Sequence, residues 1–287
     1  MRRLRAAAVP YLLILPGGLW LVIFFVIPVI ALISLSTQQG DIVDGFTQTF
    51  HFANYATAWG NYHQQFLRSL MYGGLATILC IVLAYPMAYW IAFRGGARKS
   101  MYLFLILLPF FVSFVLRTVS WQYILGDNGL VLGPLKSAGI FPQGFRVLAT
   151  GTAVVGGLTY NYLPFMVLPV YVALERIDFR LVEAAQDLYA SRAVAFRRVV
   201  LPLSLPGLFA GVLLTFVPVA ADYVNASLLG GTSNTMVGNI IQDEFLNVQD
   251  YPTGSALSFM LMALLLIGMF SYARALGTEE VLEVAAR

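Results

Sequence analysis

The stretch Tyr11-Leu-Leu-Ile-Leu-Pro-Gly-Gly-Leu-Trp-Leu-Val-Ile-Phe-Phe-Val-Ile-Pro-Val-Ile-Ala-Leu-Ile-Ser-Leu35 contains no charged side chain in 25 residues. A helix rises about 1.5 Å per residue and needs about 20 apolar residues to cross a hydrocarbon core of about 30 Å. The stretch is therefore long enough to span a bilayer as a single helix.

Further windows of this kind recur along the chain of 287 residues. No internal repeat or low-complexity tract divides the chain, and the loops are too short for a second domain. We predict one all-α domain over residues 1–287, a polytopic transmembrane helical bundle. Its six spans are expected at about residues 11–35, 66–93, 101–125, 147–173, 203–229 and 254–273.

The composition excludes several classes of protein. Hydrophobic residues make up 59% of the chain and charged residues 11%, and the mean hydropathy is +0.79. These values do not suit a soluble enzyme or a disordered chain. The single cysteine, Cys80, excludes a disulfide framework and a Cys-rich metal site, and His51 and His63 lack a metal-ligand pattern.

The beginning of the chain allows two interpretations. Arg2, Arg3 and Arg5 precede the first apolar stretch, as in a secretory signal peptide. The apolar stretch is longer than a signal peptide requires, and no clear cleavage site follows it. We therefore predict a retained helix.

The distribution of charge predicts the orientation. The N-terminus, residues 94–99, residues 175–201 and the C-terminal tail lie on one side of the predicted membrane, and this side holds 13 of the 17 Lys and Arg residues but seven of the 14 Asp and Glu residues. By the positive-inside rule this side is cytoplasmic, and so are both termini. The pI near 9.0 is then a sign of topology and not of nucleic-acid binding.

The loop at residues 175–202 is a polar island between two apolar spans. Its first part places small and apolar residues on one helical face, and a second amphipathic segment begins near Phe196. We expect two short helices, with Pro202 stopping or kinking the second one before the next span. From these residues alone the loop is either a docking element or a solvated, interfacial connector.

The run Glu183-Ala184-Ala185-x-x-Leu188, followed by Phe196 and Leu201-Pro202, resembles the EAA loop of binding-protein-dependent ABC importer permeases. The resemblance implies the type I importer permease fold. It also implies that this loop is a coupling helix, which sits in a groove of a cytoplasmic ATPase. The implied coupling residues are Glu183, Ala184, Ala185, Asp187, Tyr189, Phe196, Leu201 and Pro202.

Tyr189 departs from this family pattern, which usually has glycine at that position. A glycine permits a positive φ, which a tyrosine resists. We therefore expect the break between the two short helices to be shaped differently in this chain.

Other stretches extend the resemblance over almost the whole chain. Among them are Leu107-Leu-Pro-Phe-Phe-Val-Ser-Phe-Val-Leu-Arg117 and Tyr162-Leu-Pro-Phe-Met-Val-Leu-Pro169. They resemble the first of the two permeases in spermidine/putrescine importers, so the implied solute is a polyamine. Related permeases carry iron, thiamine or other small solutes, and these remain alternatives.

Two charged residues lie inside predicted spans, where a charge costs about 2.5–3.5 kcal/mol on insertion scales. These are Arg117 in the third span and Asp222 in the fifth. One interpretation is a structural ion pair between them. The other is a substrate path formed by Arg117, Trp121, Asp222, Tyr223 and Asn225, in which the carboxylate and the aromatic faces receive a substrate amine.

The chain contains no phosphate-binding G-x-x-x-x-G-K-[ST] loop, so we expect no cofactor and no catalysis in this subunit, with ATP and Mg bound by a partner ATPase. The implied partners are a second homologous permease, two copies of the ATPase, an extracytoplasmic binding protein, a small cationic solute and the lipid bilayer of a bacterial inner membrane, without nucleic acid. An intramembrane enzyme using Asp222 would need a second membrane-embedded carboxylate or nucleophile, and none is evident. An ion-gradient-driven transporter remains the other alternative.

Overall fold

The computed structural model describes residues 13–275, so the basic N-terminal residues and the acidic tail, with Glu279, Glu280 and Glu283, lie outside the described residues. The chain divides into two compact units. One contains residues up to 63 together with 241–262, and the other contains residues 64–240 together with those from 263 onward.

The smaller unit begins with a helix over Leu13–Ser36, which includes the π-helical turn η1 (Val22–Val26) and α2 (Ile27–Ser36). A short antiparallel hairpin follows, and its turn is closed by Asp41 Oδ1, which accepts hydrogen bonds from the amides of Val43 and Asp44. The remaining parts of this unit are β1 (Gln38–Asp41), β2 (Gly45–Gln48), the beginning of α3 (Ala53–Arg94), the end of α12 (Val237–Asp243), η5 (Glu244–Val248) and the beginning of α13 (Tyr251–Ala275).

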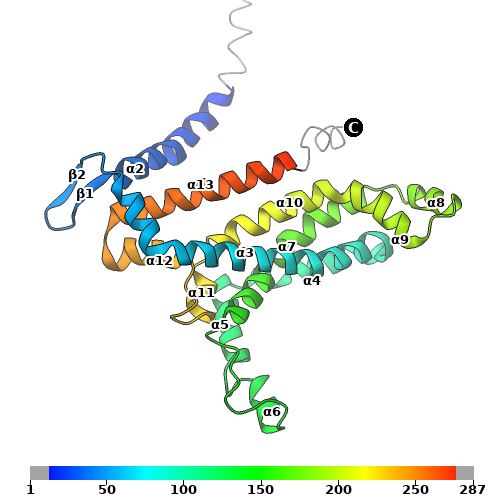
Figure 1. Ribbon diagram of the computed structural model, residues 1–287. Helices are drawn as coiled ribbons and strands as arrows, with labels where there is room; N and C mark the ends of the chain where they lie inside the picture. The colour runs from blue at the N-terminus through cyan, green and yellow to red at the C-terminus, as the bar shows by residue number, and fades with distance from the viewer. Residues whose placement is uncertain (1–12, 276–287) are drawn as a thin grey trace, which may run out of the picture. The chain divides into compact units, whose positions relative to one another are not determined.

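The larger unit is a helical bundle whose central pair is α7 (Gly151–Glu175) and α10 (Leu201–Ala220) (Figure 1). The two helices approach closely at Gly207, where an added Cβ would meet the Cβ of Ala173 and the carbonyl oxygen of Pro169. Small residues at such crossings let two backbones pack tightly inside a membrane. The other elements are η2 (Gly96–Arg98), α4 (Lys99–Leu107), η3 (Leu108–Phe111), α5 (Phe114–Leu125), α6 (Leu132–Ser137), α8 (Arg180–Asp187), α9 (Arg192–Ala195), η4 (Phe196–Val200) and α11 (Val224–Leu229).

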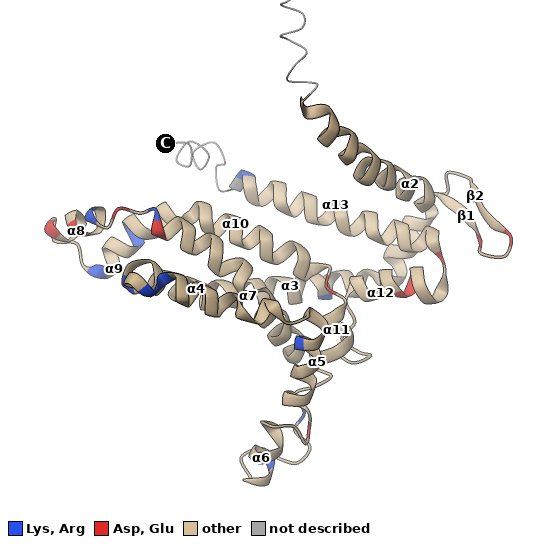
Figure 2. Ribbon diagram, turned by 180° about the vertical axis from the view of Figure 1, so that it is seen from behind, with Lys and Arg blue, Asp and Glu red and all other residues tan. Residues whose placement is uncertain are grey.

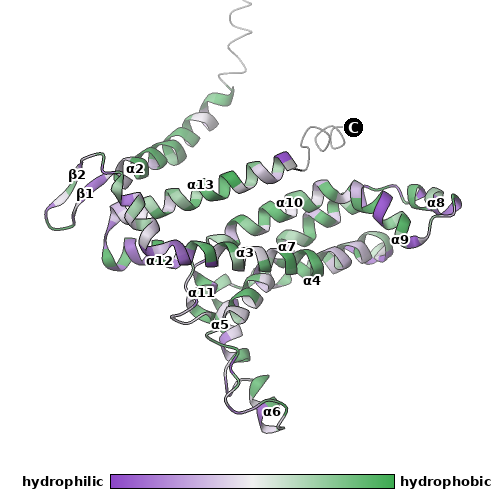
Figure 3. Cartoon of the chain, viewed as in Figure 1, coloured by the Kyte–Doolittle hydropathy of each residue, from purple (hydrophilic) through white to green (hydrophobic). Residues whose placement is uncertain are grey.

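The helices account for the predicted membrane spans. Among residues 13–275, five helices are long and apolar enough to cross a membrane, and a bent pair of helices makes a sixth span possible. Apolar residues dominate α10 (Figure 3), and α3 and α7 also contain stretches apolar enough to cross a membrane. The prediction of an all-α polytopic bundle is confirmed.

Two spans are interrupted, and only in the fifth does the sequence indicate irregular backbone, because Pro218 frees a carbonyl one turn earlier. The third bends by 88° between Phe111 and Phe114, where Val112 is extended with ψ 139°. The fifth ends at Ala220, and Asp222 lies in the break before α11. Pro109 and Pro218 precede these breaks, and proline removes a backbone donor from a helix, which the apolarity of a sequence window does not reveal.

A polar loop follows α5 and contains α6. Lys136 Nζ lies 2.9 Å from Asp127 Oδ1, and Arg146 Nε lies 3.2 Å from Asp127 Oδ2. The hydrogen bond and the charge of Lys136, together with the charge of Arg146, hold the pKa of Asp127 below its ordinary value. The loop is therefore tied together by one carboxylate with two cations.

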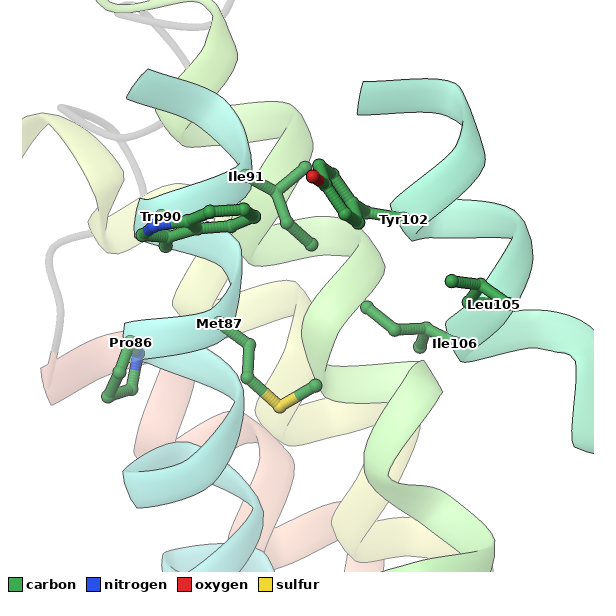
Figure 4. Close-up of a pocket in the computed structure, with 7 residues that line it drawn as sticks. All are labelled: Pro86, Met87, Trp90, Ile91, Tyr102, Leu105 and Ile106. Atoms are coloured by element: carbon green, nitrogen blue, oxygen red, sulfur yellow. The ribbon is translucent and has the colours of Figure 1, made fainter. Parts of the chain in front are cut away.

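An apolar groove of about 460 Å³ lies between α3 and α4 (Figure 4). Trp90 and Ile91 from α3 line it, and Tyr102 and Ile106 from α4 face them. No charged residue lines this groove, so it is distinct from the polar sites described below.

Candidate coupling and substrate sites

The loop between α7 and α10 has one side packed on the bundle. Val182 of α8 and Ala195 and Val200 of the following segment are buried in a core shared with α3 and α7. The ring of Phe196 meets Tyr85 and Tyr89 of α3 edge-on, at centroid distances of 5.7 and 5.9 Å. The loop is therefore packed directly against two membrane helices, α3 and α7.

The other side of the loop is open to solvent. Glu183, Ala184 and Asp187 of α8 are exposed, whereas Ala185 is half-buried against the core. Charged residues gather around α8 and α9 and at the beginning of α4 (Figure 2). The first of the two predicted short helices is confirmed as α8, and its face with the first EAA residues is exposed.

Helix α8 ends in a left-handed turn at Tyr189. The amide of Ala190 donates to the carbonyl of Ala185 at 3.1 Å, and the amide of Tyr189 donates to the carbonyl of Gln186 at 2.9 Å. This pair of bonds is the Schellman motif, which places a left-handed residue just after the helix. Tyr189 takes that position with φ 63°, so our expectation that tyrosine would avoid a glycine-like conformation was wrong.

The second helix of the loop continues into the next span. Ser191 caps α9 through its Oγ, which accepts from the amide of Val194 at 3.4 Å. The helix then runs without interruption over Arg192–Ala220, through a π-helical turn that ends just before Leu201. Pro202 therefore does not stop the helix, contrary to the prediction. It lies in the first turn of α10, directly after the π-helical turn, whose wider hydrogen-bonding pattern accommodates a residue without a backbone donor.

Asp222 is the centre of a buried polar network. Only 6% of its surface is exposed, and its carboxylate accepts hydrogen bonds from the Tyr162 hydroxyl at 3.0 Å, from the Asn225 amide at 2.7 Å and from Asn225 Nδ2 at 3.0 Å. All three donors are neutral. Within the described residues, no cation lies within 4 Å of this carboxylate.

The network extends to two residues that the sequence analysis did not single out. Asn161 Nδ2 donates to Asn225 Oδ1 at 3.0 Å and to Thr118 Oγ1 at 3.1 Å. These contacts tie α5, α7 and α11 together behind Asp222. Asn161 and Thr118 are neutral residues within apolar windows, and only their hydrogen bonds to this network reveal them.

Arg117 does not form the predicted ion pair with Asp222. The ion pairs among the described residues are Lys99 with Glu175, and Asp127 with Lys136 and Arg146. The Arg117 guanidinium instead lies over the ring of Phe110 at 4.6 Å and near the ring of Phe114 at 5.7 Å. The two intramembrane charges that the sequence analysis paired are thus held apart.

The structure places the other predicted path residues in different surroundings. Asn225 is fully buried and holds Asp222 in place. Tyr223 is 44% exposed, next to the carboxylate in sequence, and Trp121 is half-buried against Tyr160, at a ring distance of 5.3 Å. Among the described residues, no group of three or more His, Cys, Asp and Glu side chains is placed to hold a metal ion.

Comparison with solved structures shows a likeness of fold. A chain from a bacterial ABC transporter involved in the import of the acidic polysaccharide alginate aligns with a TM-score of 0.70, covering 96% of this chain and 97% of that one, at 18% identity. At this identity the likeness concerns the fold alone. The class, ABC transporter permeases, follows from relatives in sequence, which are transport system permease proteins.

Sequence comparison identifies the family within that class. A spermidine/putrescine transport system permease protein PotB of Haemophilus influenzae is 38% identical over 259 residues, covering 89% of this chain and 90% of the relative. PotB of Escherichia coli is 34% identical over 268 residues, covering 92% and 98%. No protein-family model matches the chain. The chain belongs to the PotB family of permease subunits.

Proposed function

We propose that this chain forms half of the translocation path of an importer for spermidine and putrescine. Its relatives, which it matches over almost their whole length, are spermidine/putrescine permeases. The observation in the structure that supports a cationic substrate is the buried Asp222 carboxylate, whose only hydrogen-bond donors are neutral. A carboxylate buried without a counter-charge is costly, and a substrate ammonium group supplies that charge.

The chemistry around Asp222 suits an alkylammonium group. A primary ammonium has three donors and no acceptor, so it binds carboxylate and hydroxyl oxygens, and aromatic faces attract its charge. The exposed Tyr223 ring lies beside the carboxylate in sequence and supplies a surface for the methylenes. In this proposal Trp121 borders the path, and Asn225 orients the carboxylate.

The energy for import comes from a cytoplasmic ATPase that docks on α8. The exposed side of α8, with Glu183, Ala184 and Asp187, meets the ATPase, and the buried side with Phe196 passes its movement to α3. Two ATPase copies bind ATP and Mg, while this chain binds no cofactor. Both termini and the loop at residues 175–202 lie on the cytoplasmic side, in accordance with its excess of Lys and Arg.

Two further partners complete the importer. A second, related permease encloses the path with this chain, and a soluble binding protein delivers the polyamine on the outer side. Purification of the tagged chain from its native membrane, with identification of the accompanying proteins by mass spectrometry, tests this assembly. We expect a P-loop ATPase and a second EAA-bearing permease; recovery of the folded chain alone would contradict the proposal and favour a self-sufficient transporter.

Substitution of Asp222 tests the substrate site. Asp222→Asn removes the charge while keeping the shape, and a hydrogen bond to a charged group contributes about 1.5–3 kcal/mol. We therefore expect the apparent affinity for spermidine in reconstituted vesicles to fall about 10- to 100-fold, with the complex still assembled. Asp44→Asn, at an exposed carboxylate, is the matched control and should leave uptake unchanged.

Normal spermidine kinetics in assembled Asp222→Asn would remove Asp222 from the substrate site. A panel of iron, thiamine and polyamines separates the alternative solutes. Uptake that continues without ATP, and stops when ion gradients are dissipated, would instead establish a secondary transporter.

A further inference from the structure

The Arg117 guanidinium is buried without a hydrogen-bond partner for two of its nitrogens. The residue is 8% exposed, and Nε and Nη1 are enclosed without a hydrogen-bond acceptor among the described residues. Its surroundings are the rings of Phe110 and Phe114. Aromatic faces offset only part of the cost of removing a guanidinium from water, and a carboxylate offsets more. In this position the guanidinium lacks an anionic partner among the described residues, and a carboxylate brought beside it would stabilise its charge.

Asp222 is the carboxylate to which Arg117 is connected through the bundle. The ring of Phe114 lies 6.1 Å from the ring of Tyr162, and the Tyr162 hydroxyl donates to Asp222. Two aromatic residues, Phe114 and Tyr162, thus connect a buried cation without an ion-pair partner to a buried carboxylate without a counter-cation among the described residues.

The sequence offers no other carboxylate in this part of the bundle. Between residues 188 and 242 Asp222 is the only Asp or Glu, and between residues 100 and 174 the only one is Asp127. Asp127 is already paired with Lys136 and Arg146 outside the spans.

Both groups stand next to breaks in their helices. Arg117 lies in the first turn of α5, directly after the 88° bend, and Asp222 lies between α10 and α11. Residues at helix ends can absorb the backbone changes that accompany a conformational switch.

We propose that Arg117 is a tethered competitor for the substrate ammonium group at Asp222. In the arrangement seen here, Phe110 and Phe114 hold the guanidinium away, and Asp222 is available to the substrate. In the releasing arrangement Arg117 pairs with Asp222 and displaces the ammonium group. The inference rests on the proposed binding of substrate by Asp222, and it makes Arg117 a determinant of release.

Two substitutions should shift the substrate affinity in opposite directions. Arg117→Gln removes the competitor, so we expect spermidine to bind the purified complex about 5-fold or more tightly, with a lower kcat for uptake because release is slowed. Arg117→Lys should restore much of the wild-type behaviour, since it keeps the charge. Phe110→Leu removes the ring face that retains Arg117, so it should weaken spermidine binding.

The measurements are equilibrium binding of radiolabelled spermidine to the purified full complex and KM and kcat for uptake in proteoliposomes. In the Asp222→Asn background, Arg117→Gln should have no further effect on affinity. The control is Arg68→Gln, because the Arg68 guanidinium already has a partner, the carbonyl of Thr235, to which its Nη1 donates at 2.9 Å. This control should not raise the affinity.

Several outcomes would overturn the inference. Unchanged affinity in Arg117→Gln would exclude a competitor, and tighter binding with unchanged or higher kcat would indicate simple repulsion of the substrate. Loss of the second permease from the purified complex would show that Arg117 serves assembly. If the wild-type complex neither binds nor imports polyamines, the proposed function itself fails, which is distinguishable from failure of the Arg117 variants alone.

Discussion

Replacement of Tyr189 by glycine should stabilise the turn that ends α8. Tyr189 has φ 63°, and its side chain is 100% exposed, so the substitution removes backbone strain without losing packing within the chain. A left-handed backbone costs a non-glycine residue about 1–2 kcal/mol. The extra freedom of glycine in the unfolded chain offsets about 0.5–1 kcal/mol of that gain. The net expectation is stabilisation by about 0.5–1 kcal/mol.

Hydrogen exchange of the amides of Tyr189 and Ala190, which close the turn, measures this effect locally. For Tyr189→Gly we expect slower exchange, and a thermal midpoint raised by about 1–4 °C for a chain of this size. Tyr189→Ala is the matched control, because it removes the ring but keeps the Cβ, and it should leave exchange close to that of the wild type. Faster exchange in Tyr189→Gly would refute the assignment of strain to this residue.

Three other predictions concern packing, the loop after α5 and the polar network. Gly207→Ala should destabilise the bundle by about 1–3 kcal/mol, because the added Cβ meets backbone and side-chain atoms of α7. The control Gly74→Ala, whose added Cβ has nothing within 4 Å, should not destabilise it. Equal thermal stability of the two variants would contradict the close crossing of α7 and α10. The pKa of Asp127 is lowered, so its ion pairs stabilise the loop above the ordinary value of 3.8, and this stabilisation is lost as the pH falls below that value. In Lys136→Met, hydrogen exchange of α6 should lose most of this pH dependence. The same pH profile in the variant and the wild type would contradict the role of the Lys136–Asp127 pair. Asn161→Leu leaves the buried Asn225 Oδ1 without its donor and should lower the free energy of unfolding by about 1–3 kcal/mol. An unchanged free energy of unfolding would contradict a stabilising role of the network.

The sequence was sufficient for the number and approximate position of the membrane helices, because hydropathy over about 20 residues is a direct physical requirement of the bilayer. The first short helix of the loop between α7 and α10 was also predictable from its apolar face, whereas the second is continuous with the next span. Pro218 indicated irregular backbone near Asp222, but the complete end of α10 there and the bend near Phe111 were not predicted, since a prolyl residue permits either a kink or a complete break. Tertiary contacts decide between these results.

The candidate site was only partly predictable. A charged residue in an apolar span attracts notice, so Arg117 and Asp222 could be identified from the sequence. Their partners could not, because Tyr162 and Asn161 are uncharged and lie far away in the chain. Depth in the membrane suggested an ion pair, but packing placed Phe114 and Tyr162 between the two charges.

The exposed side of α8 and the buried side of the same loop give the account of coupling a physical basis. Val182 and Phe196 pack on the bundle while Glu183 is exposed, so in the proposed coupling a movement of α8 acts on the membrane helices through these contacts. The loop thus contacts the core of the bundle on its buried side and, in the proposed assembly, the ATPase on its exposed side.

The central claim is that this chain imports polyamines only when ATP hydrolysis drives it. The most direct measurement is accumulation of radiolabelled spermidine in liposomes containing the purified complex, with binding protein on the outer side and ATP enclosed on the ATPase side. We predict accumulation against a gradient that requires both ATP and the binding protein. Accumulation without ATP, or its absence when all partners are present and ATP is hydrolysed, would contradict the account.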